Sequence, residues 1–351
     1  MMKAVWIEGF GDPGVLRVGE RPVPEPGAGD VRVRVEACGV CRHDVLTRSG
    51  AFPLTVLPVI LGHQIAGVVD AVGPEVTEPA PGDRVLSMVY QTCGRCPECL
   101  AGRQPLCRER PRFLGEDIDG GYAQYVVAKA DTWLALPDGL AVEAGAVLTC
   151  SAGTAYHAIV ARGRGQAGET ALVTGASGGV GGQAVLMLRA LGLVPVAVTR
   201  REQAVPALKK AGAEHVIVAP DGKYRAMVKQ LTGVGADLAI DIVGGAGLGE
   251  TMHSVRPGGR VVVLGNLAGG TAQIQPALLI LKEIALIGTK SVTREEMATV
   301  LALVADGTFP VGTVRRRPLA QAAAAHREME SGEVAGRTVL IPQPGALVPH
   351  G

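Results

Sequence analysis

Four of the seven cysteines in this chain lie close together, with the spacing C-x2-C-x2-C-x7-C. They are Cys93, Cys96, Cys99 and Cys107. Four thiolates from one loop can close a tetrahedral shell around zinc, which leaves no position for a substrate and makes such a site structural. An iron-sulfur cluster uses the same donors, and a single C-x2-C can act as a redox pair. We expect zinc, because bound zinc would order a loop that has little core of its own.

This cysteine segment resembles the structural-zinc lobe of the medium-chain zinc alcohol dehydrogenases, and the resemblance extends over nearly the whole chain. It implies a second, catalytic zinc site. In Cys38-Gly39-Val40-Cys41 the family pattern places the ligand after Gly-Val, which selects Cys41 and leaves Cys38 as a buried thiol. The segment Gly62-His63-Gln64 resembles the family's Gly-His-Glu motif and offers His63. Cys150 stands where the family has its last ligand.

Two thiolates and one imidazole hold zinc with its fourth position open, which is the Cys2His arrangement known from alcohol dehydrogenase. Zinc in such a site acts as a Lewis acid on a bound alcohol or carbonyl. Each residue alone has a plainer interpretation, since isolated cysteines are usually buried small hydrophobic residues and His63 could be a hydrogen-bonded core histidine. Together, and with matching flanks, Cys41, His63 and Cys150 favour catalytic zinc.

Three polar residues beside these ligands complete the expected site. Gln64 replaces the family's Glu, which removes a negative charge from the vicinity of the metal. Asp44 follows the ligand segment as in the family, and we expect it to accept a hydrogen bond from His63, although it could be a solvated surface carboxylate. His43 stands where many relatives carry the Ser or Thr that passes the alcohol proton towards solvent. An imidazole can relay a proton near neutral pH, or His43 is only a pocket wall or a hydrogen-bond partner.

A glycine-rich segment, Thr174 to Gly181, lies between a buried-type strand and a helix-like segment. Glycines there allow a tight turn and close backbone approach, and the amino end of the helix can hold a pyrophosphate. Its position inside a strand-turn-helix-strand pattern predicts a dinucleotide site. We expect the cofactor to contact Ser177, Gly178, Gly179 and Val180.

The next strand ends in Thr199-Arg200-Arg201, where NAD-preferring relatives carry an acid that binds the ribose hydroxyls. Thr199 can hydrogen-bond a 2′-phosphate and Arg200 can pair with it bidentately, so the sequence predicts NADP(H) over NAD(H). The alternative is that both arginines are a solvated helix start.

Four further positions follow from the resemblance alone. It places Thr154 near the nicotinamide, with Leu264 and Asn266 lining that side at the end of a strand. Arg337 occupies a position that in relatives can reach the pyrophosphate, whereas by default it would be a surface arginine.

The elements that must position these residues show two different secondary-structure patterns along the chain. The first ~150 residues are rich in Gly and Pro, with short β-rich runs such as 31–35. From about Ala152, strands alternate with helices, which describes a parallel, doubly wound sheet. Its expected strands are 170–174, 193–198, 215–219, 237–242, 260–265 and 284–288, and the helices between them 183–191, 204–211 and 226–231. Expected after Gly288 are a helix at 295–306, a helix-like stretch at 319–331 and a strand at 337–341.

We therefore predict an α/β protein with two domains. A GroES-like, β-rich catalytic domain comprises residues 1–150 and 289–351, with the structural-zinc lobe near 91–110. A Rossmann domain comprises residues 151–288. A length of 351 residues agrees with two domains of ordinary size.

The composition narrows the possible partners. A formal net charge of +1 gives no electrostatic case for nucleic acid or an anionic membrane. No uninterrupted apolar run is long enough to span a bilayer and the start lacks a signal-peptide core, so we expect a cytoplasmic protein. Asparagine occurs only at Asn266, which fits a thermophilic source or a GC-rich genome.

The predicted reaction is reversible hydride transfer between NADP(H) and an alcohol-carbonyl pair, with two zinc ions per chain. Because the segments from Thr174 to Gly181 and from Gly265 onward also resemble enoyl-thioester and quinone reductases, reduction of a conjugated double bond or a quinone is the alternative. A complete ligand set favours the carbonyl reaction, since conjugate reduction does not require zinc. A non-catalytic, zinc-stabilised NADP-binding protein is the third interpretation. The resemblance also implies a homo-tetramer or dimer.

Overall fold

The longest strand, β3 (Asp30–Val40), alternates buried and partly exposed side chains through its first half. Val31, Val33 and Val35 are buried, which is the period of two that a strand shows when one face lies on a core. This strand is the centre of a mainly antiparallel sheet. Its partners are β5 (Gln64–Val72), β9 (Tyr125–Lys129) and β18 (Arg337–Ile341).

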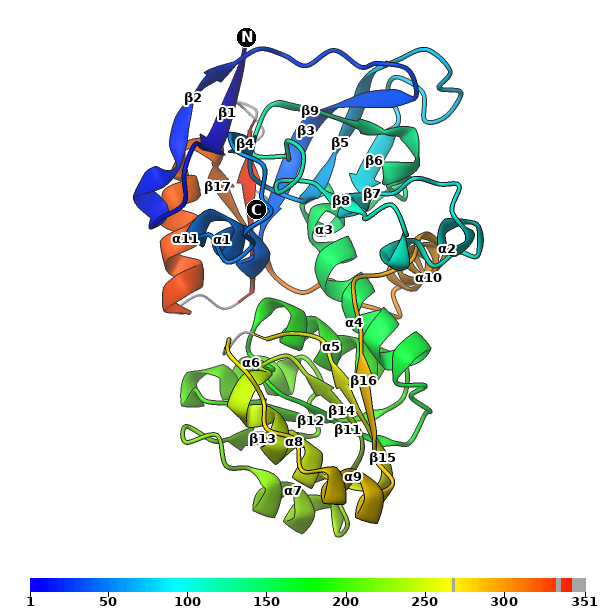
Figure 1. The fold of residues 1–351 in the computed structure, drawn as a ribbon, viewed down its shortest axis with the longest axis vertical. Coiled ribbons are helices and arrows are strands. Elements are labelled where there is room, and N and C mark those ends of the chain that lie inside the picture. The colour runs from blue at the N-terminus through cyan, green and yellow to red at the C-terminus, as the bar shows by residue number, and fades with distance from the viewer. Residues whose placement is uncertain (267–268, 333–335, 343–351) are drawn as a thin grey trace. The chain divides into compact units, whose positions relative to one another are not determined.

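The computed structural model describes residues 1–266, 269–332 and 336–342, and the chain forms two units (Figure 1). The first unit holds residues 1–150, 293–305 and those from 313 on. The second holds residues 151–292 and 306–312. Because β18 pairs with β3, the C-terminal part of the chain belongs to the same sheet as the N-terminal part.

Further strands complete the first unit, and the large sheet has the order β10-β6-β5-β3-β18-β17 with β9 also on β3. Its remaining strands are β6 (Arg84–Ser87), β10 (Trp133–Ala135) and β17 (Val314–Pro318). A small sheet contains β1 (Met2–Ile7), β2 (Arg17–Arg21) and β4 (Val59–Ile60), and another β7 (Tyr90–Gln91) and β8 (Arg112–Phe113). The helices are α1 (Arg42–Ser49), α2 (Pro97–Leu100), α3 (Val142–Val147), α10 (Arg294–Ala305) and α11 (Ala322–Ser331). The predicted β-rich, GroES-like unit is confirmed.

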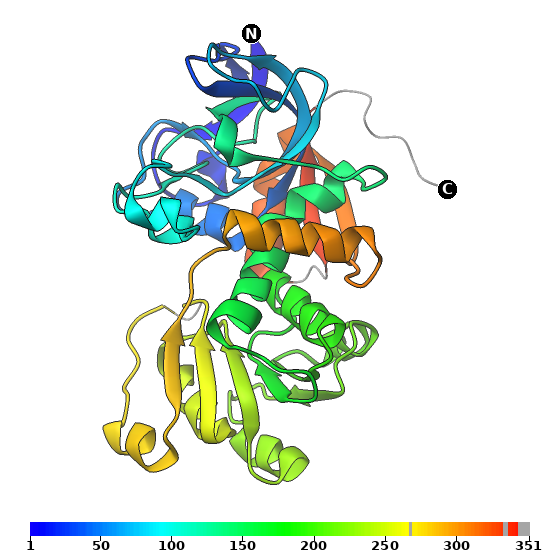
Figure 2. The same ribbon diagram turned by 90° about the vertical axis from the view of Figure 1, so that its right-hand side faces the viewer.

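The second unit contains one six-stranded sheet in the order β13-β12-β11-β14-β15-β16, and every pair in it is parallel. Figure 2 shows β14, β15 and β16 running side by side in one direction. This order is that of a doubly wound Rossmann sheet, which confirms the predicted fold class. The strands are β11 (Thr170–Val173), β12 (Val194–Thr199), β13 (His215–Val218), β14 (Ala236–Asp241), β15 (Val255–Val263) and β16 (Ala285–Gly288). Its helices include α5 (Gly179–Ala190), α6 (Val205–Lys210), α7 (Arg225–Thr232), α8 (Leu248–Ser254) and α9 (Pro276–Lys282).

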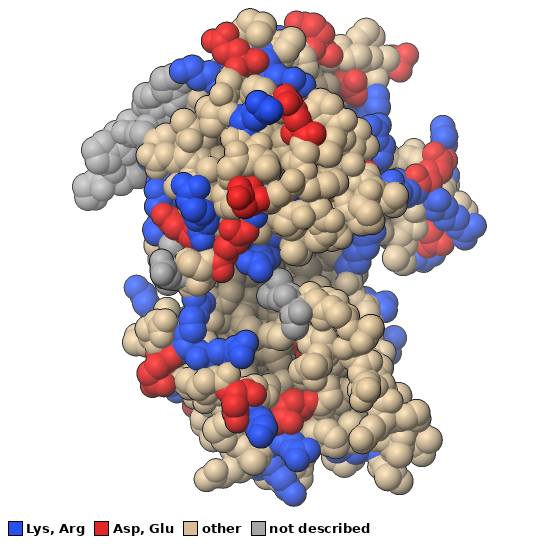
Figure 3. All heavy atoms as spheres, turned by 60° about the vertical axis from the view of Figure 1, so that its left-hand side comes forward, with Lys and Arg blue, Asp and Glu red and all other residues tan. Residues whose placement is uncertain are grey.

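A single long helix, Val142–Arg162, contains α3, α4 (Thr154–Tyr156) and two π-helical stretches, Leu148–Gly153 and His157–Arg162. It is long and apolar enough to cross a membrane, but 61% of its most apolar 18-residue stretch is buried inside the protein. The buried core helices of soluble proteins have the same length and composition, so this helix is weak evidence for a membrane span. On the face shown in Figure 3, basic and acidic side chains are interspersed.

Candidate functional site

Cys41, His63 and Cys150 come together in the first unit although they are far apart in the sequence. Their donor atoms all lie within 4.8 Å of one another. Cys41 Sγ is 3.8 Å from Cys150 Sγ, and His63 Nε2 is 3.3 Å from Cys150 Sγ. Two sulfur atoms on a tetrahedral zinc ion, each at about 2.3 Å, would be about 3.8 Å apart. The donor set therefore fits zinc in both chemistry and spacing.

Local structure explains how two of these ligands are held. Cys41 caps α1, and its backbone N–H donates to Asp44 Oδ2 at 2.8 Å, so the end of β3 and the start of the helix fix the thiol. Gly62, just before His63, has a φ of +96°. A Cβ at Gly62 would collide with the ring of Tyr122, so only glycine allows this approach.

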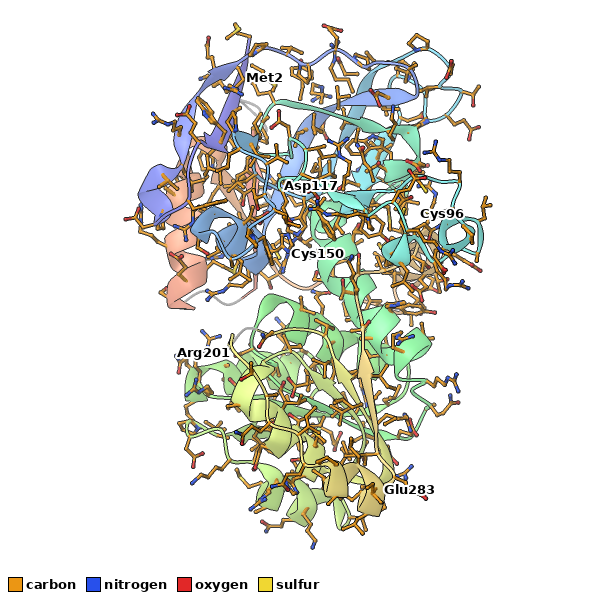
Figure 4. All side chains as sticks on the ribbon, in the orientation of Figure 1. Met2, Cys96, Asp117, Cys150, Arg201 and Glu283 are labelled. Carbon is orange, nitrogen blue, oxygen red and sulfur yellow. The ribbon has the colours of Figure 1, made fainter. Side chains whose placement is uncertain are left out.

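Cys150 lies in the first π-helical stretch of the long helix, Leu148–Gly153, and it ends the N-terminal segment of the first unit. Single π-helical turns occur often at functional sites because the extra residue changes the direction of the side chains. Figure 4 labels Cys150 at the lower edge of the first unit.

The ring of His63 is oriented by Asp44. His63 Nδ1 is 2.8 Å from Asp44 Oδ1, and both side chains are buried. This contact leaves Nε2 facing the thiols, as a ligand nitrogen requires. Burial lowers the pKa of His63, but Asp44 and Cys41 outweigh it and raise the pKa to about 10. The surroundings of His63 therefore favour positive charge at this ring, which a metal ion on Nε2 would supply in place of a proton.

The two thiols of the site influence each other. The hydrogen bond from Cys150 lowers the pKa of the Cys41 thiol well below its usual value, against the effect of burial. The neighbouring Cys41 sulfur and burial raise the pKa of Cys150 well above its usual value. The pair gives up one proton readily, whereas loss of the second places two negative charges side by side. A divalent cation between the two sulfurs removes that cost, so these thiols suit a metal.

His43 lies against this site between two aromatic rings. Its ring centroid is 4.6 Å from that of Phe52 and 5.8 Å from that of Phe113, and 5.0 Å from that of His63. His43 Nε2 is 2.8 Å from Glu116 Oε2. Sequence reasoning did not single out Glu116, because it is 73 residues from His43 and no local motif marks it.

Gln64 and Arg337 form a hydrogen-bonded pair beside the ligands. Arg337 Nη2 donates to Gln64 Oε1, and both side chains are buried. Arg337 is therefore not a surface arginine, which was the alternative from the sequence. Strand β18 brings this residue into the core of the large sheet. Gln64 Nε2 is in turn 3.4 Å from His63 Nε2.

The four clustered cysteines form the second candidate metal centre, around α2. Their sulfur atoms all lie within 4.8 Å of one another. The sulfur atoms are 3.9 Å apart for Cys93–Cys99, 4.0 Å for Cys96–Cys107 and 3.5 Å for Cys93–Cys107. These values again suit the edges of a zinc tetrahedron, about 3.8 Å. Backbone N–H groups, first that of Arg108, lower the pKa of Cys96 to about 6, which favours the thiolate form that binds metal.

The glycine-rich turn of the second unit connects β11 to α5. Gly178 caps the helix, and Gly179 and Val180 are its first residues. A Cβ at Gly181 would collide with the carbonyl oxygen of Gly175, so the helix can pack against the turn only with glycine there. The first amide groups of a 12-residue helix are thus presented at a tight turn, as pyrophosphate binding requires.

The end of β12 lies against this turn. Thr199 Oγ1 donates to Ser177 Oγ at 3.0 Å, and Arg201 Nη2 lies 3.1 Å from the same hydroxyl oxygen. Arg200 Nε instead donates to the carbonyl oxygen of Pro220 at 3.2 Å. Of the two arginines, Arg201 is therefore the one beside the glycine-rich turn, whereas the sequence prediction named Arg200.

The remaining predicted cofactor residues also lie in the second unit. Thr154 begins α4, and Leu264 follows β15, where its N–H donates to the Asp241 carbonyl. A Cβ at Gly244 would approach the Asn266 Cα to 2.9 Å, so the ends of β14 and β15 meet closely there. Carboxyl ends of parallel strands are where doubly wound sheets bind nucleotides.

Comparison with known proteins agrees with both units. The model of the alcohol dehydrogenase GroES-like domain matches residues 27–138, and that of the zinc-binding dehydrogenases matches residues 179–306. An alcohol dehydrogenase of Geobacillus stearothermophilus is 34% identical over 97% of this chain and 99% of its own length. An acryloyl-coenzyme A reductase of Sulfurisphaera tokodaii is 33% identical over 84% of this chain and 88% of its own.

Among solved structures, the crystal structure of AibC is 45% identical, with a TM-score of 0.92 over 98% of this chain and 96% of that one. Identity of this extent, over both units, goes beyond a shared fold. The chain therefore belongs to the alcohol dehydrogenase family of the medium-chain dehydrogenases/reductases.

Proposed function

We propose that this protein is a zinc-dependent alcohol dehydrogenase that interconverts an alcohol and its ketone or aldehyde with NADP(H). The observation that carries the proposal is the convergence of Cys41, His63 and Cys150, whose donor atoms lie within 4.8 Å of one another. Zinc in such a set supplies Lewis-acid chemistry at the substrate oxygen, and the nicotinamide gives or takes the hydride.

The chain's own residues orient this site. Asp44 holds His63 so that Nε2 faces the two thiols. The Gln64–Arg337 pair packs beside His63, and its amide adds no negative charge there. His43, held by Phe52, Phe113 and Glu116, forms an aromatic wall next to His63. Proton relay through His43 stays a prediction, and Glu116 is the acceptor that such a relay would use.

NADP(H) is proposed over NAD(H) because β12 ends in a hydroxyl, that of Thr199, and two arginines follow it, with no carboxylate at the strand end. Thr199, Ser177 and Arg201 form one hydrogen-bonded cluster at the glycine-rich turn. An arginine is suited to a phosphate, whereas a carboxylate at the end of this strand would repel it. We expect Arg201 to contact the 2′-phosphate and assign Arg200 a lesser part.

A second candidate function is reduction of an enoyl thioester. The similarity to the acryloyl-coenzyme A reductase of S. tokodaii favours it. That reaction adds hydride and a proton across a conjugated double bond, and it does not need a metal at the carbonyl oxygen. We place this function below the carbonyl reaction, because the complete set of zinc ligands would serve no purpose in it.

One experiment separates these functions. Metal analysis is combined with a screen of NADPH consumption across aldehydes, cyclic ketones, quinones and enoyl thioesters, for the wild type and His63→Ala. We expect two zinc ions per wild-type chain, and carbonyl reduction that falls at least a hundredfold in His63→Ala with one zinc retained. Thioester reduction that persists in His63→Ala would establish the alternative. Bound zinc and NADPH without turnover on any substrate would indicate a non-catalytic binding protein.

We further propose a cytoplasmic homo-oligomer, a tetramer or dimer, that acts on small molecules and binds neither nucleic acid nor membrane. Ile280 and Leu281 on α9 are 72% and 82% exposed, next to the edge strand β16, which gives an apolar surface for a second copy. Light scattering tests the oligomeric state. A monomer at micromolar concentration would contradict it.

A further inference from the structure

A chain of buried hydrogen bonds runs from His63 through Asp44 to helix α11. Beyond the His63–Asp44 contact, the Tyr122 hydroxyl lies 3.4 Å from Asp44 Oδ2 and 3.1 Å from His326 Nε2. All four residues are at most 2% exposed. The chain thus links the candidate metal site to a residue that lies 204 positions beyond Tyr122 in the sequence.

The chemistry of each group fixes the direction of these hydrogen bonds. An ionised carboxylate can only accept hydrogen bonds, so the Tyr122 hydroxyl donates its hydrogen bond to Asp44. The tyrosine oxygen then has to accept from His326 Nε2–H. Burial lowers the pKa of His326 to about 4, so its ring is neutral near pH 7 and has one N–H. Its Nδ1 has no hydrogen-bond partner among the described residues, which suits a bare lone pair better than a second N–H.

Asp44 consequently receives three hydrogen bonds. They come from the Cys41 backbone N–H, the Tyr122 hydroxyl and His63 Nδ1. Donors on both oxygens hold the carboxylate in one orientation. That orientation keeps a proton of His63 on Nδ1 and points Nε2 towards the thiols, where a bound metal would take the place of the second proton.

A packing role alone does not account for Tyr122 and His326. Apolar side chains of similar size would fill a core at lower cost, because every buried polar group must be hydrogen-bonded. A separate ion pair, between buried Arg48 on α1 and Glu330 on α11, already ties these two helices together. The Tyr122–His326 pair is directed at Asp44 instead.

We propose that Tyr122 and His326 are positioning residues of the catalytic metal site, which hold the Asp44 carboxylate where it accepts the Nδ1 proton of His63. This inference rests on the proposed function, since it requires a metal at Cys41, His63 and Cys150. Neither residue touches the ligand atoms, and both act through Asp44.

The test is the rate at which zinc passes to a colorimetric chelator. The wild type should release two zinc ions in two phases, and His63→Ala identifies the phase of the Cys41–His63–Cys150 site because it lacks that phase. In Tyr122→Phe we expect this phase to be about tenfold faster, the lower end of what partners of metal ligands contribute. The four-cysteine site is the internal reference, and its phase should stay unchanged. Tyr125→Phe, whose ring faces Arg32, is the matched control and should release zinc as the wild type does.

A second pair of variants tests His326. His326→Gln can still donate to Tyr122 and should release zinc within twofold of the wild type, whereas His326→Leu cannot donate and should be faster. Combined with Tyr122→Phe, His326→Leu should add little, because both remove one connected chain. If Tyr122→Phe does not fold, the comparison of Gln with Leu decides alone.

Two results would overturn the inference. One is a zinc-release rate within twofold of the wild type in folded Tyr122→Phe and His326→Leu, and the other is equal acceleration of both zinc phases. Failure of the proposed function is different, since a wild-type chain that binds zinc only at the four cysteines would show it directly.

Discussion

Arg337 donates a hydrogen bond to the side-chain oxygen of Gln64, and the two side chains are buried next to His63. A neutral amide thus occupies the position beside the metal site where the resemblance implies a carboxylate. Gln64→Glu would add a negative charge there, which makes loss of a proton from a bound alcohol less favourable. We expect the pH profile of alcohol oxidation to move up by about one unit. Gln64→Leu, which removes the hydrogen bond without adding charge, is the control. An unmoved profile in Gln64→Glu contradicts this view of the site.

Arg201 and Arg200 differ in what they contact, so their removal should differ in effect. Loss of a charge-assisted hydrogen bond costs about 1.5 to 3 kcal/mol. In Arg201→Ala we therefore expect KM for NADPH to rise at least tenfold while KM for NADH stays within twofold. Arg200→Ala should change either value by less than threefold. Steady-state kinetics with both cofactors measure this, and a wild type that uses NADH and NADPH equally well would refute the preference itself.

The His43–Glu116 pair separates proton relay from a simple pocket wall. If His43 passes a proton to Glu116, Glu116→Gln should lower kcat for alcohol oxidation about a hundredfold and flatten its pH dependence, with KM little changed. If the pair only shapes the wall, KM should change and kcat should not. His43→Ala with unchanged turnover and pH dependence would exclude the relay.

His326 should make stability depend on pH. Its pKa is lowered to about 4 by burial and by Arg48, although Asp44 and Cys41 act in the opposite direction. In the unfolded chain the pKa of His326 is near 6.5. Between pH 6.5 and 4 the His326 ring is therefore protonated in the unfolded state and neutral in the folded state. The contribution of His326 to the free energy of unfolding is therefore complete above pH 6.5 and falls towards pH 4, by at most roughly 3 kcal/mol. Urea unfolding at several pH values measures the slope, and His326→Gln should reduce it. An equal slope in the variant would assign the effect to other groups.

The four-cysteine lobe should contribute stability rather than chemistry. Cys99→Ser removes one thiolate of a set whose sulfurs lie within 4.8 Å of one another. We expect one zinc per chain to be lost, a lower Tm, and a kcat within threefold of the wild type at temperatures below unfolding. Metal analysis and calorimetry on the same sample check this. Loss of turnover without loss of Tm would give the lobe a direct part in catalysis.

The strands of the second unit could be predicted because each is a short buried run between glycines or polar turns. The expected run 170–174 is β11 at Thr170–Val173, and the others agree within a few residues except β15, which starts earlier, at Val255. Helices α8 and α9 were not expected. Three of the four residues before α8 are glycine, and its only large apolar side chains, Leu248 and Met252, are both buried. Helix α9 buries Leu278 and Leu279 only in part, so both helices leave a weak apolar pattern in the sequence.

The residues around the metal ligands show where sequence reasoning ends. Short flanking motifs were enough to single out Cys41, His63 and Cys150. Glu116 and His326 reach the site only through tertiary folding, across 73 residues to His43 and 204 residues to Tyr122. The sequence favoured Arg200 over Arg201 as the phosphate contact. Adjacent residues at a strand end point in opposite directions, and the exact end of a strand cannot be predicted from its pattern.

The 3.8 Å between Cys41 Sγ and Cys150 Sγ has a consequence for handling the protein. Two thiols this close need to approach only to about 2.05 Å to form a disulfide. Metal bound between them would act as a protecting group against air. Once it is stripped, oxidation would seal the site against re-entry, so that loss of zinc becomes permanent in air and reversible only while a reductant keeps the sulfurs apart.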